Sequence, residues 1–304
     1  MHTSMFNSLL QRRKFITNAV KATGSFALLS TQLSFTSDKK LNKQYTVQEI
    51  IDTILKEGNL STISDTVDTI KSGNANQIVT GIVTTMFPTI AVIKESVKHN
   101  ANFIIAHEPT FYNHRDDKDW VNNNDTVNQK QELLDKNSIT IWRFHDYCHS
   151  LKPDAIIYGM VKKAGWLSYF KLDENILTIP KISLHNLVLH LKSSLNIAHV
   201  RVIGDLHAQC ENVTVMPGAF GGQKQVGVVE AKHPDVLIVG EVSEWETAEY
   251  IRDSQLLGKK TALIILGHAV SEEPGMEYVA EWLRPMFSSV NITHIPSYDP
   301  FTWL

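Results

Sequence analysis

The sequence predicts an α/β protein, because short apolar runs rich in β-branched residues alternate with longer amphipathic stretches from Thr46 onwards. The chain has 304 residues, of which 43% are hydrophobic and 20% charged, so it can bury one large core or two smaller ones. The alternation begins again in the second half of the chain. We therefore expect two linked α/β halves, residues 38–170 and 171–304, with a site in the crevice between them, where strand ends meet.

The first 37 residues are expected to lie outside this fold. Arg12 and Arg13 precede an apolar run at 19–33 that Lys21 interrupts, which is similar to a twin-arginine export signal. A run this short and charged cannot span a membrane of about 30 Å, and no cysteine follows it to accept a lipid. We expect residues 1–37 to be removed and the mature chain to be periplasmic or extracellular. The alternative is a cytoplasmic protein with a basic amphipathic N-terminal helix, since no clean A-x-A cleavage site follows.

The first half is expected to alternate helices with strands that end in polar residues. The predicted helices cover 47–56, 90–99, a segment ending near 137, and 154–164. The predicted strands cover 78–85, 103–106 and 139–143. A segment rich in Asp and Asn at 112–128 is expected to be a loop. The second of these strands ends at His107, and the third leads into His145, Asp146 and His149.

The second half is expected to repeat this alternation without a repeat of fixed length. The predicted helices cover 184–195, 223–230, 245–253 and 276–287. The predicted strands cover 198–202, 213–216, 236–239, 262–266 and 292–295. The strand at 262–266 ends at Gly267 and His268, so this half also has a strand that ends in an imidazole.

Charge and cysteine content limit the classes of partner. The formal charge of −3 gives no overall attraction to nucleic acid or to an anionic membrane, so we expect neither a nucleic-acid partner nor a stable membrane span. The two cysteines, Cys148 and Cys210, are too few for a disulfide framework or a Cys-rich zinc site. With 13 histidines in the chain, a metal would be held by imidazole and carboxylate groups.

The first candidate cluster is His107 and Glu108, which follow an apolar strand and precede Pro109. Consecutive residues of an extended chain point to opposite sides, so the two need a local turn or must bind different metals. The alternative is a His and a Glu at the solvated mouth of a strand.

The second cluster runs from His145 to His149 and includes Asp146 and Cys148. The two imidazoles share a face if this segment is helical. The alternative is a surface loop, with Cys148 a small buried side chain.

The third cluster is His268 and Glu272, four residues apart after a glycine. They can bind one metal on a helix, and a carboxylate can bridge two metals. The alternative is a helix start organised by Ser271 and Pro274. Three strand-end clusters in one chain favour a metal site, and nitrogen and oxygen ligands suit zinc, iron or manganese.

With these residues, the chain resembles the NGG-one-interacting factor three (NIF-three) family, also described as GTP cyclohydrolase 1 type 2-like proteins, over roughly residues 46–304. The features that carry the resemblance are the three clusters, the Gly-containing stretch 216–222 and the segment 235–241. The resemblance implies two linked α/β halves with a pair of divalent metals between them. It also implies a homo-oligomer, a toroidal hexamer.

The resemblance implies six metal ligands, two of which depart from the family pattern. The family's paired His at the first strand end falls on His107 and Glu108, so a carboxylate replaces the second imidazole. Its aspartate in the second cluster falls on His149, with His145 four residues earlier. The last His and a bridging Glu fall on His268 and Glu272 without a departure.

The expected function is a metal-dependent hydrolase that acts on a small-molecule substrate of unknown identity, with Asp146 or Glu273 accepting a proton from the attacking water. GTP cyclohydrolase activity is implied by the resemblance alone, and no guanine-reading motif is apparent. A non-catalytic metal-binding or scaffold ring protein is the alternative. A third possibility is that the two exchanged ligands have abolished metal binding.

Overall fold

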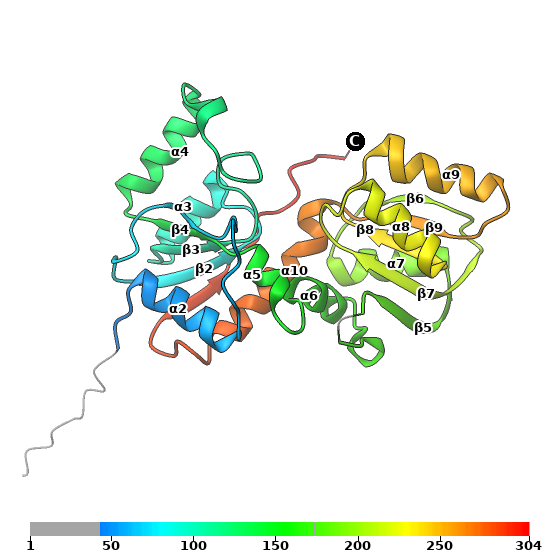
Figure 1. The fold of residues 1–304 in the computed structure, drawn as a ribbon, viewed down its shortest axis with the longest axis horizontal. Coiled ribbons are helices and arrows are strands. Elements are labelled where there is room, and N and C mark those ends of the chain that lie inside the picture. The colour runs from blue at the N-terminus through cyan, green and yellow to red at the C-terminus, as the bar shows by residue number, and fades with distance from the viewer. Residues whose placement is uncertain (1–42, 173, 304) are drawn as a thin grey trace, which may run out of the picture. The chain divides into compact units, whose positions relative to one another are not determined.

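The computed structural model describes residues 43–172 and 174–303 of the chain. The predicted export signal at 1–37 lies outside these residues. The α/β class is confirmed, since two five-stranded sheets each carry helices, and Figure 1 shows the two linked halves. Within the described part of the chain, no helix combines the length and the apolar character needed to cross a membrane.

The first sheet has the order β1-β4-β3-β2-β10. Its strands are β1 (Ile70–Ser72), β2 (Gly81–Thr85), β3 (Phe103–Ala106), β4 (Thr140–Arg143) and β10 (Asn291–His294). Strands β10, β2, β3 and β4 are parallel, and β1 is antiparallel to β4 at the edge. Because β3 and β4 are parallel neighbours, with Ala106 opposite Arg143, the residues that follow both strands emerge side by side.

Helices cover both faces of this sheet. They are α2 (Val47–Glu57) and α10 (His268–Leu283) on one face, and α3 (Ile90–Lys98) and α4 (Asp125–Lys136) on the other. In β3, Phe103 and Ile105 pack against α2 and α10, whereas Ile104 packs against α3 and α4. Successive strand side chains point to opposite faces, so a continuous apolar run is needed where both faces are covered.

The second sheet has the order β5-β7-β8-β9-β6. Its strands are β5 (Ile176–Ser183), β6 (Arg201–Ile203), β7 (Gln209–Met216), β8 (Val236–Val239) and β9 (Ala262–Ile265). Helix α7 (Leu184–Leu195) shares a core with one face of this sheet, and α8 (Gly222–Lys232) and α9 (Glu249–Leu256) share a core with the other. The short turns are η1 (Asp119–Val121), η2 (Leu167–Tyr169) and the π-helical η3 (Glu244–Ala248).

Helices α5 (Asp146–Ser150) and α6 (Ala155–Lys163) follow β4, and α6 packs on α10. The backbones of α6 and α10 are in contact, because a Cβ added to Gly159 would lie 2.5 Å from the Cα of Gly275. Two glycines facing each other allow this approach. The contact fixes α10, which carries His268 and Glu272, against the segment that carries His145 and His149.

The structure corrects several expectations about the elements. The helix predicted at 276–287 begins at His268 instead. The prediction was wrong because Pro274, which suggested a helix start, lies inside the helix. Strand β5 was missed, because Pro180 interrupts its pattern; it is an edge strand whose register shifts between Thr178 and Ile182. The strand predicted at 292–295 was assigned to the second half, but β10 pairs with β2 in the first sheet.

Candidate metal centre

Two neighbouring strand ends place His107, Glu108 and His145. The backbone of this region stays paired beyond the strands: His107 N–H donates to the Thr85 carbonyl at 3.1 Å, and Phe144 N–H donates to the Ala106 carbonyl at 2.9 Å. The side chains of His107 and Glu108 are buried, at 0% and 8% exposure. They are therefore held by a paired backbone rather than by a free loop.

Three imidazoles meet at this edge of the first sheet. His145 precedes α5 and His149 lies one turn later, with His149 N–H donating to the His145 carbonyl at 3.1 Å. The ring centroids are 4.7 Å apart for His107 and His145, 5.1 Å for His107 and His149, and 5.0 Å for His145 and His149. Each ring offers a nitrogen within 4.8 Å of the others, so the three can hold a metal ion.

Helix α10 brings the third predicted cluster to the same place. His268 Nε2 lies 3.0 Å from Glu272 Oε2, which is itself 3.7 Å from His107 Nε2. Glu108 Oε1 lies 3.6 Å from His145 Nε2 and 3.7 Å from His268 Nε2. His107, Glu108 and Glu272 form a second group that can hold a metal. All six side chains predicted as ligands are thus brought together.

Each of the four imidazoles is oriented by an oxygen at its Nδ1. The distances are 3.1 Å from His107 to the Phe144 carbonyl, 2.9 Å from His145 to Asp146 Oδ1, 3.0 Å from His149 to Asp154 Oδ2 and 3.2 Å from His268 to Glu241 Oε2. A carbonyl or carboxylate oxygen can only accept, so each Nδ1 carries the hydrogen. Metal-binding histidines are typically held in this way, which leaves Nε2 to the ion.

His107 tests most directly whether this site suits a metal ion. Burial and the neighbouring imidazoles of His149 and His145 hold its pKa well below the ordinary value, so the ring is neutral. Because Nδ1 donates to a carbonyl, Nε2 has a lone pair, yet this fully buried atom has no hydrogen-bond partner among the residues that the structure describes. A buried nitrogen without a partner is costly. A cation at this atom would satisfy it.

The carboxylates of Glu108 and Glu272 also face the candidate metal centre. The buried Arg143 donates to the His107 carbonyl at 3.0 Å and lies 3.3 Å from Glu108 Oε2, which leaves Glu108 Oε1 toward the histidines. Burial raises the pKa of Glu272. Burial acts against the charged form of His268, but hydrogen bonds to Glu108, Glu241 and Glu272 raise its pKa to about 12. Without a metal, the carboxylates thus retain a proton on His268, which an ion would displace.

The turn after β7 supplies a close backbone contact. Gly218 has φ of +73°, and a Cβ added there would lie 1.9 Å from Glu272 Oε1. Ser271 Oγ accepts from Gly218 N–H at 2.9 Å and fixes this approach. The glycine-rich stretch that contributes to the resemblance therefore cradles the predicted bridging carboxylate, and a side chain would fill that space.

Asp146, one of the two predicted proton acceptors, lies behind His145. Its Oδ1 accepts from the ring, and its Oδ2 accepts from Thr66 Oγ1 at 2.8 Å and from Val67 N–H at 3.1 Å. Through these contacts Asp146 orients the imidazole of His145.

Glu273, the other predicted proton acceptor, belongs to neither ligand group among residues 43–172 and 174–303. Its carboxylate accepts from Ser297 N–H at 2.9 Å and from Met86 N–H at 3.3 Å, and lies 3.2 Å from His294 Nε2. Adjacent helical residues are about 100° apart, so Glu273 points away from the face that Glu272 occupies. Its role as a proton acceptor stays a prediction that these contacts do not favour.

Sequence reasoning did not single out four supporting residues. Asp68 accepts from three backbone N–H groups at the start of α5, at 2.7, 3.2 and 2.8 Å, and burial raises its pKa to about 6. Asp154 and Glu241 hold two of the rings, and Arg143 holds Glu108. Glu241 follows a predicted strand end, and Arg143 is a charge inside an apolar strand, so both carried a signal. Asp68 lies in a polar stretch with no such signal.

Comparisons with known proteins identify relatives of this chain. The sequence model of Duf34/NIF3 (NGG1p interacting factor 3) matches residues 45–300. A GTP cyclohydrolase 1 type 2 homolog of Clostridium perfringens is 24% identical over 255 residues, covering 76% of this chain and 89% of that protein.

Solved structures show the same fold. A hypothetical protein of Staphylococcus aureus has a TM-score of 0.67 at 17% identity, covering 86% of this chain and 100% of its own. A Bacillus cereus protein related to NIF3 gives the same values. A protein of unknown function, ybgI, has a TM-score of 0.69 at 19% identity, covering 84% of this chain and 100% of its own.

Proposed function

We propose that this chain, which belongs to the Duf34/NIF3 (NGG1p interacting factor 3) family, holds two divalent metal ions and uses them in hydrolysis. The observation that carries the proposal is the buried His107 Nε2, which has a lone pair and no partner within residues 43–172 and 174–303. Four other potential ligands are grouped with it, and the fifth, His268, lies 3.0 Å from Glu272 Oε2. The rings are oriented through Nδ1.

The ligand arrangement supports two ions rather than one. The two groups that can hold a metal share His107, whose one free nitrogen can serve a single ion. His268, outside both groups, lies 3.0 Å from Glu272 Oε2 and 3.7 Å from Glu108 Oε1 and can complete the second. One ion would lie among the imidazoles of His107, His145 and His149. The other would lie between Glu108 and His268, with Glu272 bridging to the first, since its Oε2 faces both His107 and His268.

The donor set favours zinc, iron or manganese. It contains imidazole nitrogens and carboxylate oxygens, and neither group includes a cysteine from the described part of the chain. Cys148 lies one residue before His149, but burial raises its thiol pKa well above the ordinary value. Cys148 also belongs to neither ligand group, so it is not proposed as a ligand.

The chemistry follows from this arrangement. Bound divalent ions would make water a nucleophile near neutral pH and polarise an electrophilic carbon or phosphorus. The chain would hold the rings through their Nδ1 acceptors and would fix Glu108 through Arg143. Burial of His107 and Glu272 would exclude bulk water from one side of the site.

A substrate screen tests the catalytic part of this proposal. The metal-loaded chain is offered phosphoesters, amides and cyclic esters, with GTP included because of the relative's name. Turnover should depend on the metal and fall at least about tenfold in Glu272→Gln. Glu281→Gln, on the exposed side of the same helix, is the matched control and should keep the activity. Two bound metals with no turnover on any class would favour a non-catalytic metal-binding or scaffold protein.

We also propose that residues 1–37 direct export of the mature chain to the periplasm or beyond. The paired Arg12 and Arg13 support this proposal. Replacing both by lysine should retain the full-length chain in the cytoplasm of the host. A mutant chain that is exported and shortened like the parent would exclude this route.

A homo-oligomer, a hexamer by the family resemblance, completes the proposal. Light scattering of the purified mature chain should give a mass of about six chains. A monomeric mass would contradict it.

A further inference from the structure

A pocket of about 810 Å³ lies beside the candidate metal centre. Glu108 and His268 from the centre form part of its lining, together with the start of α3 and the segment after β10. A molecule in this pocket would therefore have one end against two of the proposed metal ligands. Pockets of this size bind small organic molecules.

A surface of aromatic and proline side chains forms part of the remaining wall. It comprises Phe87, Pro88, Pro109, Tyr112, Tyr298 and Pro300. Tyr112 and Tyr298 are 52% and 75% exposed. The Phe87 ring lies edge-on to the His268 ring, with centroids 5.7 Å apart, so this wall reaches the metal centre. Exposed aromatic faces around a concave site favour a ligand with a flat apolar body.

The pocket also holds a buried positive charge. Lys130 is 3% exposed, and its Nζ donates to the Thr110 carbonyl at 2.7 Å and lies 5.2 Å from the Tyr112 ring centroid. Among the residues that the structure describes, no carboxylate lies within 4.0 Å of this ammonium. The carboxylate that acts on it at longer range, Asp116, is paired with Lys71 and Arg143. Thr89, Ile90 and Ala91, at the N-terminus of α3, line the same pocket, and its first turn has no acidic residue. The helix dipole adds to the positive potential.

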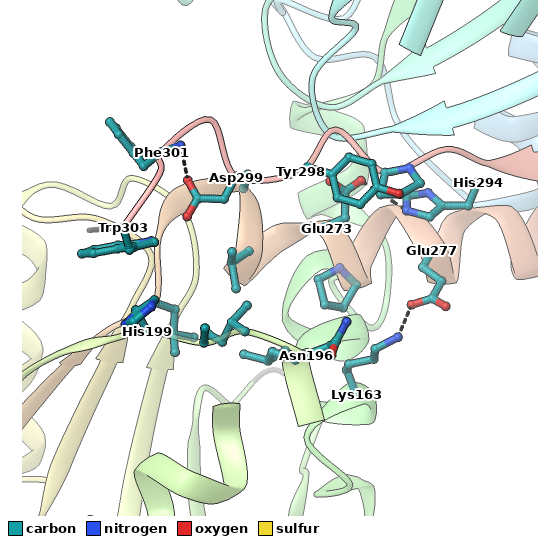
Figure 2. A pocket seen from close by; sticks show the side chains of 18 residues that line it. Lys163, Asn196, His199, Glu273, Glu277, His294, Tyr298, Asp299, Phe301 and Trp303 are labelled. Atoms are coloured by element: carbon teal, nitrogen blue, oxygen red, sulfur yellow. Dashed lines mark hydrogen bonds and ion pairs between the residues drawn. The ribbon is translucent and has the colours of Figure 1, made fainter. Parts of the chain in front are cut away.

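A second pocket, of about 580 Å³, shows the contrast (Figure 2). Its lysine, Lys163, is paired with Glu277 at 2.8 Å. This pocket also has aromatic walls, from residues such as Phe301 and Trp303, but its cation is neutralised. An unpaired cation beside the metal centre therefore distinguishes the first pocket.

We propose that the pocket beside Glu108 and His268 takes an anionic substrate with an aromatic or other flat apolar body, whose carboxylate or phosphate is held near Lys130. The inference rests on the proposed function, because it places the scissile bond at the metal centre. It adds the substrate class, which the centre alone does not give.

Binding of two matched probes tests the inference. 1-Naphthoate carries the ring and the anion, and 1-naphthalenemethanol carries the ring without the charge. Calorimetry with the metal-loaded chain should show naphthoate binding about tenfold more tightly, a typical effect of one charged contact. Lys130→Met should remove this preference and leave the affinity for the alcohol unchanged. Lys163→Met, in the second pocket, should change neither the preference for naphthoate nor the affinity for the alcohol.

A second variant keeps the inference testable if Lys130→Met does not fold. Ala91 is exposed in the first turn of α3, where a carboxylate suits the helix. Ala91→Glu should weaken naphthoate binding several-fold and leave the alcohol unaffected, whereas Ala91→Gln should change neither. Equal affinity of the parent for the two probes, or a preference that survives both Lys130→Met and Ala91→Glu, would overturn the inference.

Metal content, measured on the same samples, separates this inference from the proposed function. Naphthoate selectivity that persists after chelation and depends on Lys130 supports the pocket even if the metal proposal fails. Selectivity that disappears on chelation but is indifferent to Lys130→Met would show that the anion binds the metal, and would overturn the pocket assignment.

Discussion

Asp154 holds His149 with one carboxylate oxygen and helix α6 with the other. Its Oδ2 lies 3.0 Å from His149 Nδ1, and its Oδ1 accepts from Ile156 N–H at 2.8 Å and Ile157 N–H at 3.1 Å. The orientation of a proposed ligand is thus tied to the start of a helix that packs on α10.

Replacing Asp154 should separate these two roles. Asn is as good an N-cap as Asp, so Asp154→Asn should change stability by a few tenths of a kcal/mol while lowering metal affinity about 10-fold to 100-fold. Asp154→Ala should lose the cap as well, at a further cost of about 1 kcal/mol. Calorimetric metal titration and urea unfolding measure the two effects.

Asn124 is a matched control for this experiment, because it caps α4 without contacting the metal centre. Asn124→Ala should lower stability by about 1 kcal/mol and leave metal affinity unchanged. If Asp154→Asn bound metal as tightly as the parent, Asp154 would not position His149.

Gly218→Ala should damage the centre through Glu272. The added methyl group would overlap Glu272 Oε1, 1.9 Å away, and displace the proposed bridging carboxylate. Gly221 has a similar φ, +80°, but no atom of the described part of the chain lies within 4 Å of an added Cβ, so Gly221→Ala reports backbone strain alone. We expect both variants to lose about 1 kcal/mol of stability from the positive φ. Metal stoichiometry should fall in Gly218→Ala, and equal metal content in the two variants would refute the cradle.

The two ligands that depart from the family pattern have their own partners, Arg143 for Glu108 and Asp154 for His149. Glu108→His, which restores the second imidazole, should therefore leave the buried Arg143 without this carboxylate. Arg143 would keep Asp116, 3.7 Å away, so we expect a loss of about 1–3 kcal/mol in unfolding free energy from the lost charged hydrogen bond. Denaturant unfolding of the metal-free proteins measures it. A variant as stable as the parent would show that Arg143 does not depend on Glu108.

Stability should depend on pH through Lys130. Burial lowers the pKa of this lysine from 10.5 to about 8, so between these values the unfolded chain binds more protons than the folded chain. Unfolding free energy should therefore rise with pH in this window, by roughly 3 kcal/mol relative to Lys130→Met, which lacks the group. Urea unfolding at about pH 7 and about pH 10 measures the difference. If the unfolding free energies of the parent and of Lys130→Met changed in parallel with pH, Lys130 would not be a buried charged lysine.

Strand ends account for most of what the sequence could predict about the site. His107, His145 and His268 each follow a buried apolar run. The carboxyl ends of the parallel strands β3 and β4 meet at one edge of the first sheet, whereas His268 follows β9 of the second sheet. The pairing of β10 with β2 could not be predicted, because the four residues of β10 say nothing about which sheet they join.

The arrangement of the remaining site residues depends on where helix α10 begins. The helix was predicted at 276–287, whereas a shared ligand face for His268 and Glu272 required a helix that already covers residues 268–272. Because the helix begins at His268, Glu272 lies one turn later on the same face, and Glu273 turns toward Ser297. Asp154 was missed for a similar reason: its contact with His149 depends on the turn between α5 and α6, which a local pattern does not specify.

Elemental analysis of the mature chain, purified without chelator, tests the central claim most directly. The parent and Glu281→Gln should contain about two divalent ions per chain, and His268→Ala and Glu272→Ala should lose them. A parent chain without metal, and without uptake of zinc, manganese or iron when these are added, would contradict the account.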